Sequence, residues 1–324
     1  MADHGTLTQD RRPAVGTVRR PGRRAELIRS IRAAPLLYLM IGVVMAWAIL
    51  FHFIPIWGIS FAFRRFNLVS GFWSADWVGF KYFAQFLSDP FAFRIIRNTV
   101  LLGFWSIVFT FPAPIVFALL LNEIGNSAFK RSIQTLTYLP HFVSTVVIVG
   151  IIFQLFEWER GIGTDIIELF TGERRDVFID PRWFRPLYVV SSIWQELGWG
   201  TIIYLAALAG VNAELYEAAR VDGAGRWQQA LHVTVPALIP TITILFILNT
   251  RNLVQIGFEK AFLLQNPGTY ETGDIIATYV YRRGIEGLQF SYATAIGLLN
   301  SVLAFAIVLS THKIVQRLRG EGLW

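Results

Sequence analysis

Several ionisable and amide side chains stand inside stretches of sequence that are otherwise apolar. Glu196 lies about ten residues into the stretch 186–209, which at about 1.5 Å per residue places it near the middle of a bilayer-spanning helix. A second group, Asn249, Arg251 and Asn252, interrupts another apolar stretch. Lipid does not tolerate such groups, so they are candidates for a solute pathway. A structural network between helices explains each single residue equally well.

Aromatic and amide side chains adjoin the first group, and sugar recognition uses this mixture of hydrogen-bonding groups and aromatic faces. The candidate pathway residues are therefore Trp194, Gln195, Glu196, Trp199, Asn249, Arg251 and Asn252. We expect the second group to face the pathway. We expect the carboxylate of Glu196 to be held by a hydrogen bond or an ion pair, since an unpaired charge there would repel an acidic sugar.

The connection 210–235 has the residues of a short helix–turn–helix. Asn212 can cap a helix N-terminus, and Gly223 permits the left-handed conformation that ends such a helix. A second short helix follows, and Pro236 is expected to open the next span, where its missing N–H costs nothing. Ala218 and Ala219 allow another backbone to come close, so this surface suits docking to a partner protein. An amphipathic helix pair resting on lipid is the alternative.

The sequence lacks the patterns of self-contained catalysis and of cofactor or metal binding. There is no Gly-Lys dipeptide, so no phosphate-binding loop of the Gly-Lys-Ser/Thr type exists. The five histidines are scattered without zinc-ligand spacing, and there are no cysteines. We expect no catalytic, cofactor or metal site in this chain.

The composition requires a membrane protein. The 324 residues are 54% hydrophobic and only 16% charged, with a mean hydropathy of +0.49, whereas soluble domains are nearer a quarter charged. Apolar stretches long enough, or nearly so, to cross the bilayer predict an all-α fold with six spans. They are Leu36–Phe53, Thr99–Leu121, Ile133–Phe156, Pro186–Ala209, Pro236–Thr250 extended by Leu253–Phe258, and Tyr292–Ser310.

Basic residues in the connections predict that both termini are cytoplasmic. With that orientation the inside segments have a net charge of +7 in 85 residues, and the outside segments +1 in 113. The bias rests mainly on residues 1–34, a basic cytoplasmic tail suited to anionic lipid headgroups. No aromatic residues interleave its arginines, so we expect no nucleic-acid partner. Residues 35–324 form the transmembrane domain.

The residues of the loop resemble a known signature. Glu217-Ala218-Ala219, three residues, Gly223, nine residues and Val233-x-Val235-Pro236 resemble the Glu-Ala-Ala signature of ABC importer permeases, with valines replacing its isoleucine and leucine. The segments Thr137–Phe142, Trp194–Gly200, Tyr279–Gly284 and Glu321–Trp324 are similar to the oligosaccharide and polysaccharide permeases of that superfamily. Within them the likeness is strongest to the larger permease of alginate importers. It covers roughly residues 30–324.

The resemblance implies a type I ABC importer permease fold in the bacterial cytoplasmic membrane. Its partners would be a second permease in a heterodimer, two ATPase subunits that bind ATP and Mg²⁺, and a periplasmic solute-binding protein. The substrate would be an oligosaccharide or polysaccharide, with alginate a candidate. The residues that would couple to the ATPase are Glu217, Ala218, Ala219, Asp222, Gly223 and Arg226.

Two other classes of protein also fit a polytopic chain. A secondary transporter or channel has no use for the loop signature, and ATP dependence of uptake separates it. A membrane enzyme could use Glu196 or an acidic outer segment that contains Glu157, Glu159, Asp165 and Glu168. Activity of the purified chain without partners would reveal that class.

Overall fold

The computed structural model describes residues 31–67, 69, 71 and 74–319, so most of the basic tail and the last residues, with Glu321–Trp324, lie outside the described residues. The chain divides into two compact units, residues 1–58 and 59–324. In the first unit, α2 (Pro35–Ala48) passes through a π-helical turn, Ile49–Phe53, into α3 (Ile54–Ile56). The wide turn precedes Pro55, which lacks the N–H that a regular helix requires.

A small hairpin modifies the all-α expectation. A 3₁₀ segment, Trp57–Phe63, leads into β1 (Arg64–Arg65), which pairs antiparallel with β2 (Asp76–Trp77). Ser291 fixes β1 from far along the chain, because its hydroxyl donates to the carbonyl of Arg64 (2.7 Å) and accepts from the N–H of Phe66 (3.0 Å). Apart from this hairpin, the described elements are helical.

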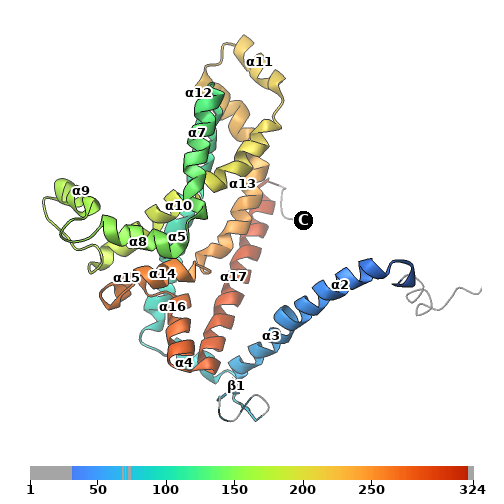
Figure 1. The fold of residues 1–324 in the computed structure, drawn as a ribbon, viewed down its shortest axis with the longest axis vertical. Coiled ribbons are helices and arrows are strands. Elements are labelled where there is room, and N and C mark those ends of the chain that lie inside the picture. The colour runs from blue at the N-terminus through green and yellow to red at the C-terminus, as the bar shows by residue number, and fades with distance from the viewer. Residues whose placement is uncertain (1–30, 68, 70, 72–73, 320–324) are drawn as a thin grey trace, which may run out of the picture. The chain divides into compact units, whose positions relative to one another are not determined.

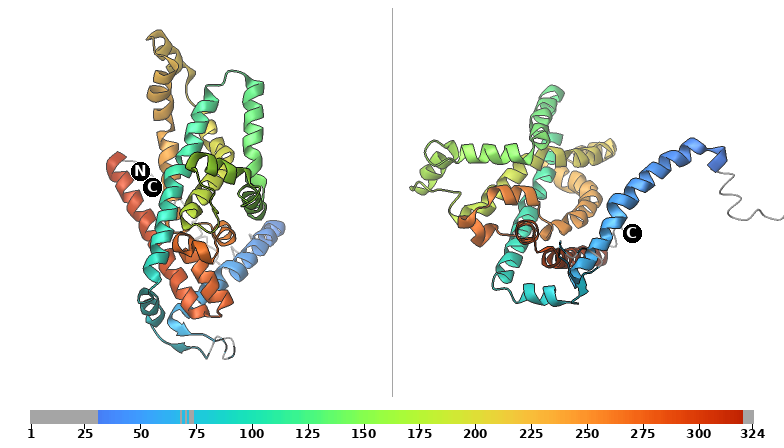
Figure 2. Two further views of the ribbon diagram at one scale, coloured as in Figure 1. Left: turned by 90° about the vertical axis from the view of Figure 1, so that its left-hand side faces the viewer. Right: turned by 60° about the horizontal axis from the view of Figure 1, so that its bottom comes forward.

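The helices of the second unit include long spans and short connectors (Figure 1). They are α4 (Lys81–Leu87), α5 (Ala92–Thr110), α6 (Pro112–Asn122), α7 (Ser127–Tyr138), α8 (Thr145–Leu155), α9 (Ile162–Thr171), α10 (Pro181–Ala209), α11 (Ala213–Val221), α12 (Arg226–Gln229), α13 (Val235–Asn249), α14 (Phe258–Leu264), α15 (Tyr270–Gly273), α16 (Ile276–Tyr281) and α17 (Phe290–Arg319). In Figures 1 and 2, α11 lies at one end of this unit and α4 at the opposite end. We call these the α11 end and the α4 end.

Among the described residues, four helical segments are long and apolar enough to cross a membrane, and six if each of two bent pairs is one span. The four are Pro35–Phe63, Ala92–Asn122, Arg226–Leu253 and Phe290–Arg317. The bent pairs are Ser127–Phe142 with Thr145–Leu155, at 102°, and Pro181–Ala209 with Ala213–Val221, at 73°. A multi-pass helical membrane protein is therefore confirmed. The orientation of the termini stays a prediction.

Two predicted spans differ from the structure. The third, Ile133–Phe156, is broken, because a 3₁₀ turn that contains Pro140 ends α7 and Ser144 begins α8 by accepting from the N–H of Val147. The extension of the fifth span, Leu253–Phe258, is wrong as a continuous helix. A 3₁₀ turn (Thr250–Leu253) ends the helix, and Gly257 precedes α14.

The long helix α10 forms the centre of the second unit, packing against α5, α6 and α13. Glycines allow two of the closest approaches. A Cβ at Gly198 would overlap the carbonyl oxygen of Thr137 in α7, and one at Gly200 would lie 2.9 Å from the ring of Pro114 in α6. Trp199 lies between these two glycines, and its side chain stays exposed.

Candidate functional site

The helix of the loop begins and ends as its residue types predict. The side chain of Asn212 accepts a hydrogen bond from the N–H of Glu214 (3.0 Å) at the start of α11. At the other end Gly223 has a φ of +79°. Ala224 N–H donates to the carbonyl of Ala219 (2.9 Å), and Gly223 N–H to that of Arg220 (3.1 Å). This pair of bonds is a Schellman motif, which confirms the predicted left-handed turn.

The helix that follows Gly223 differs from the prediction of a second short helix and a new span beginning at Pro236. The helix that starts at Arg226 runs without a stop through a π-helical turn, Ala230–Thr234, into α13, so Arg226–Leu253 is one span. Pro236 therefore does not open a helix. The wide turn just before it accommodates a residue that has no N–H.

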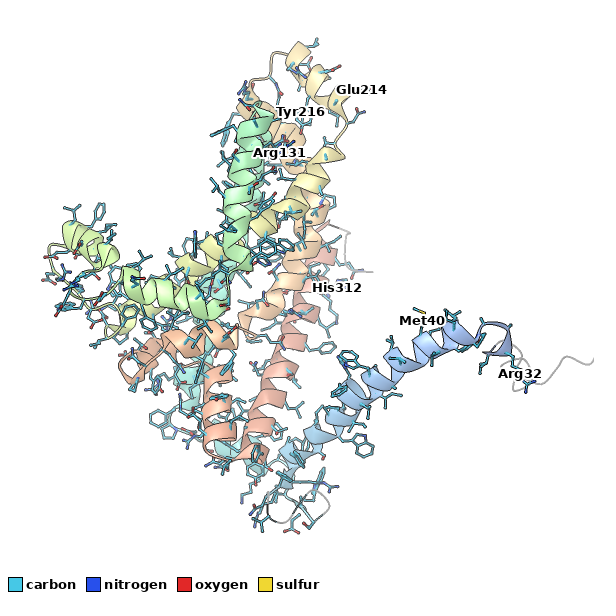
Figure 3. The ribbon with its side chains drawn as sticks, viewed as in Figure 1. Arg32, Met40, Arg131, Glu214, Tyr216 and His312 are labelled. Carbon is cyan, nitrogen blue, oxygen red and sulfur yellow. The ribbon has the colours of Figure 1, made fainter. Side chains whose placement is uncertain are left out.

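Hydrogen bonds hold α11 to the start of this long helix. The hydroxyls of Tyr216 and Thr234 lie 3.1 Å apart, and Thr234 is buried. The side chain of Gln229 donates to the carbonyl of Ala224 (2.8 Å), across the turn. Figure 3 shows Glu214 and Tyr216 on α11 at the α11 end. The loop is thus a braced element rather than a free connection.

The predicted coupling residues lie together on this braced element. Glu217, Ala218, Asp222, Gly223 and Arg226 are exposed, and Ala219 is half-buried. Large apolar side chains are exposed beside them, with Leu215 at 53%, Trp227 at 75% and Val221 at 88%. Apolar groups combined with small residues and a carboxylate form a surface suited to a protein partner.

A cavity of about 320 Å³ between α5, α6, α10 and α13 brings the two polar groups of the sequence together. Glu196, Asn249 and Asn252 line it, with Ser106 and Thr110 from α5. The side chain of Asn252 donates to that of Asn249 (3.2 Å), which donates to the carbonyl of Leu245 (2.9 Å). We call this the central cavity. Its lining combines hydroxyl, amide and carboxylate groups.

The other predicted pathway residues lie elsewhere. Arg251 is exposed on the 3₁₀ turn and is not among the residues that line the central cavity. Trp194 lines a separate apolar cavity of about 500 Å³ between α8, α9 and α10. Gln195 is half-buried and Trp199 is exposed. Successive residues of a helix point about 100° apart, so a run of neighbours such as 194–196 cannot share one cavity.

The carboxylate of Glu196, for which a partner is predicted, lies against His141. The Nδ1 atom of His141 lies 3.2 Å from a carboxylate oxygen of Glu196, within ion-pair distance, although this contact lacks hydrogen-bond geometry. The ring of His141 stacks on Trp199, with 4.5 Å between centroids and 2° between planes. The break between α7 and α8 places His141 here. Sequence reasoning assigned it no role, because no short-range pattern relates it to α10.

A buried lysine was also missed. Lys260 of α14 is 7% exposed, and its ammonium group donates to the hydroxyl of Ser192 (3.1 Å). Burial lowers the pKa of Lys260 to about 8, and the charge of Glu196 opposes that shift. Ser192 and Glu196 are one helical turn apart on α10, so Lys260 and His141 are the basic residues next to this face.

These features define a class of protein. A multi-pass helical chain has a polar cavity among its spans and, at one end, a short helical loop held by hydrogen bonds. Residues 110–320 match the family described as "Binding-protein-dependent transport system inner membrane component". The chain belongs to this family, and this membership favours a transport subunit over a secondary transporter or a membrane enzyme.

Relatives and solved structures agree with that assignment. The chain is 42% identical to Protein LplB of Bacillus subtilis, over 89% of this chain and 91% of that one. It is 39% identical to the polygalacturonan/rhamnogalacturonan transport system permease protein YteP of the same organism, over 96% and 98%. A chain of a bacterial alginate ABC transporter, crystallised with an alginate pentasaccharide-bound periplasmic protein, is 36% identical with a TM-score of 0.82, covering 91% of this chain and 99% of that chain.

Proposed function

We propose that this chain is one of two permease subunits of a bacterial inner-membrane ABC importer for acidic oligosaccharides or polysaccharides. Relatives named for transport of polygalacturonan and of alginate support this substrate class, because both are chains of uronic acids. Alginate and pectic chains are thus the leading candidates. The permease partner, two ATPases that bind ATP and Mg²⁺, and a periplasmic binding protein complete the assembly.

The braced loop is the observation on which the coupling role rests. Its exposed carboxylate, Glu217, stands beside Ala218 on a helix whose end is fixed by two backbone hydrogen bonds. A docking element must transmit force, and the bond between Tyr216 and Thr234 joins it to the base of a span. The ATPase would bind this end, with Ala219, Asp222, Gly223 and Arg226 around the contact.

The central cavity is the proposed solute pathway. Glu196 faces it, with the Nδ1 atom of His141 3.2 Å from its carboxylate. Asn249 and Asn252 offer hydrogen bonds to hydroxyl groups. Trp199, stacked on His141, gives the aromatic face near this point.

Uptake by the complete transporter in proteoliposomes tests this function. ATP is enclosed, and the binding protein is added outside with oligogalacturonate, oligoalginate or a neutral maltotriose. We expect ATP-dependent uptake of an acidic oligosaccharide. Uptake driven by an ion gradient without ATP, or no uptake of any sugar, would refute the proposal.

A further inference from the structure

A second polar cavity lies towards the α4 end of the second unit, apart from the central cavity. It has a volume of about 340 Å³ and lies between the start of α5, the helices α15 and α16, and the turn Arg282–Glu286. Its charged lining residues are Arg94, Arg282, Arg283 and Asp274. We call it the arginine pocket. Its volume is at the lower end of the range for small-molecule sites.

The arginine pocket has more positive than negative charge. Asp274 is nearly buried and accepts from Arg282 at 2.7 Å, which compensates one guanidinium group. In the part of the chain that the structure describes, no carboxylate lies within ion-pair distance of Arg94 or Arg283. Two arginines therefore face one cavity without a directly paired carboxylate, and Asp89 is linked to Arg283 only through the hydroxyl of Tyr279.

Aromatic rings hold these two arginines and leave donors unused. The guanidinium carbon of Arg94 lies 4.8 Å from the ring centroid of Phe91, and its Nε is buried without a hydrogen-bond partner. Arg283 lies 5.3 Å from the ring centroid of Tyr279, and its Nε donates to the Tyr279 hydroxyl at 3.2 Å. A guanidinium group has five N–H donors, so most of them remain free for a ligand.

Buried polar contacts fix the walls of the arginine pocket. The hydroxyl of Tyr279 donates to Asp89 at 2.8 Å. The fully buried Asn98 donates from its side chain to the carbonyls of Glu271 (2.9 Å) and Asp274 (3.2 Å). The groups are positioned before any ligand arrives, which reduces the entropy cost of binding.

We infer that the arginine pocket binds the carboxylate of a uronic acid unit, an inference that rests on the proposed function. A planar guanidinium fork matches a carboxylate with two parallel hydrogen bonds, and nearby aromatic rings and amide groups suit the sugar. The charges lie in a recess, which a single sugar ring can enter more readily than an acidic side chain on a flat protein surface. Arg94 is twelve residues before Ser106 on α5, so the pocket is about 18 Å along that helix from the central cavity.

Equilibrium binding to the assembled transporter, without the binding protein, tests this inference. The probes are tri-galacturonate and the same trisaccharide with its carboxylates reduced to alcohols. The variants are Arg94→Gln and Arg283→Gln, and the matched control is Arg97→Gln, an exposed arginine one turn further along α5. We expect tri-galacturonate affinity to fall about tenfold or more in the two pocket variants, the loss of one charge-assisted pair. We expect the control to be unchanged. The reduced sugar should bind equally to every variant.

Several outcomes would overturn the inference. One is equal loss of affinity for the charged and the reduced sugar, and another is an Arg97→Gln effect as large as that of the pocket variants. A third is unchanged sugar binding together with lost binding-protein association, which would assign the pocket to an acidic residue of that protein. Melting temperatures of the variants identify misfolding, and Arg283→Lys then serves as a charge-retaining variant with intermediate affinity expected. Normal ATP-dependent uptake with unchanged binding in the variants rejects only this inference, whereas no uptake by the unaltered transporter rejects the proposed function.

Discussion

Replacement of Gly223 tests the coupling loop with little steric disturbance. A Cβ built at Gly223 meets no atom within 4 Å, so the cost of a side chain there is set by the backbone alone. At a φ of +79°, alanine costs about 1–2 kcal/mol and a β-branched valine more, whereas asparagine is tolerated. The alternative is to abandon the turn, which loses two hydrogen bonds worth about 0.5–1.5 kcal/mol each. The two costs are comparable, so strained and rearranged loops should both be populated.

The assay compares transport with association. We expect sugar-stimulated ATP hydrolysis and uptake by the assembled transporter to decrease in the order Gly223, Gly223→Asn, Gly223→Ala, Gly223→Val. A shift of about 1.4 kcal/mol changes the ratio of the two loop states tenfold. Recovery of the ATPase on co-purification should fall less than uptake does, because the docking residues remain. Normal uptake by Gly223→Val would refute the reasoning, and so would an asparagine variant as impaired as the valine variant.

Three further expectations follow from the fold. Glu217→Lys should reduce co-purification of the ATPase while insertion into the membrane is retained, because charge reversal adds repulsion. The control is Glu159→Lys, at an exposed site outside the loop. Equal ATPase recovery with the two variants would contradict the docking role. Gly198→Ala should lower the melting temperature of the purified chain, since its Cβ overlaps backbone of α7, at a cost of about 1–3 kcal/mol; unchanged melting would contradict the close approach. The chain has no cysteines, so single cysteines can be labelled with an impermeant thiol reagent. Asn252→Cys should react in only one transport state, and Arg251→Cys should react in both states. The reverse pattern would place Arg251 in the pathway.

Local features of the fold were predictable from the sequence, because they depend on neighbouring residues. The cap at Asn212 and the left-handed turn at Gly223 belong to this group. The break before Ser144 was missed although Pro140 signals it, since the apolar run on both sides reads as one span. Pro236 was misplaced for a related reason: a helix can continue past a proline through a wider turn.

The arrangement of the central cavity depends on contacts between distant segments. Glu196, Asn249 and Asn252 were nominated because each is polar within an apolar stretch, and the structure does bring them to one cavity. Arg251 is predicted by the same rule, yet it does not line the cavity, because Asn249 and Asn252 are three residues apart on one helix face that Arg251 does not share. The sequence identifies the polar residues within a span. The direction in which each side chain points depends on its angular position on the helix and on how the helices pack.

The continuous helix Arg226–Leu253 has a mechanical consequence. In its first half, Thr234 contacts the hydroxyl of Tyr216 on α11, and near its end Asn249 and Asn252 line the central cavity. Its 28 residues make a rod about 42 Å long. A rod of that length, pivoted at one end and tilted by about 10°, moves its other end by about 7 Å. Under the proposed function this helix would act as a lever, and the stiffness of its π-helical turn would determine how much of a movement of the loop reaches the central cavity.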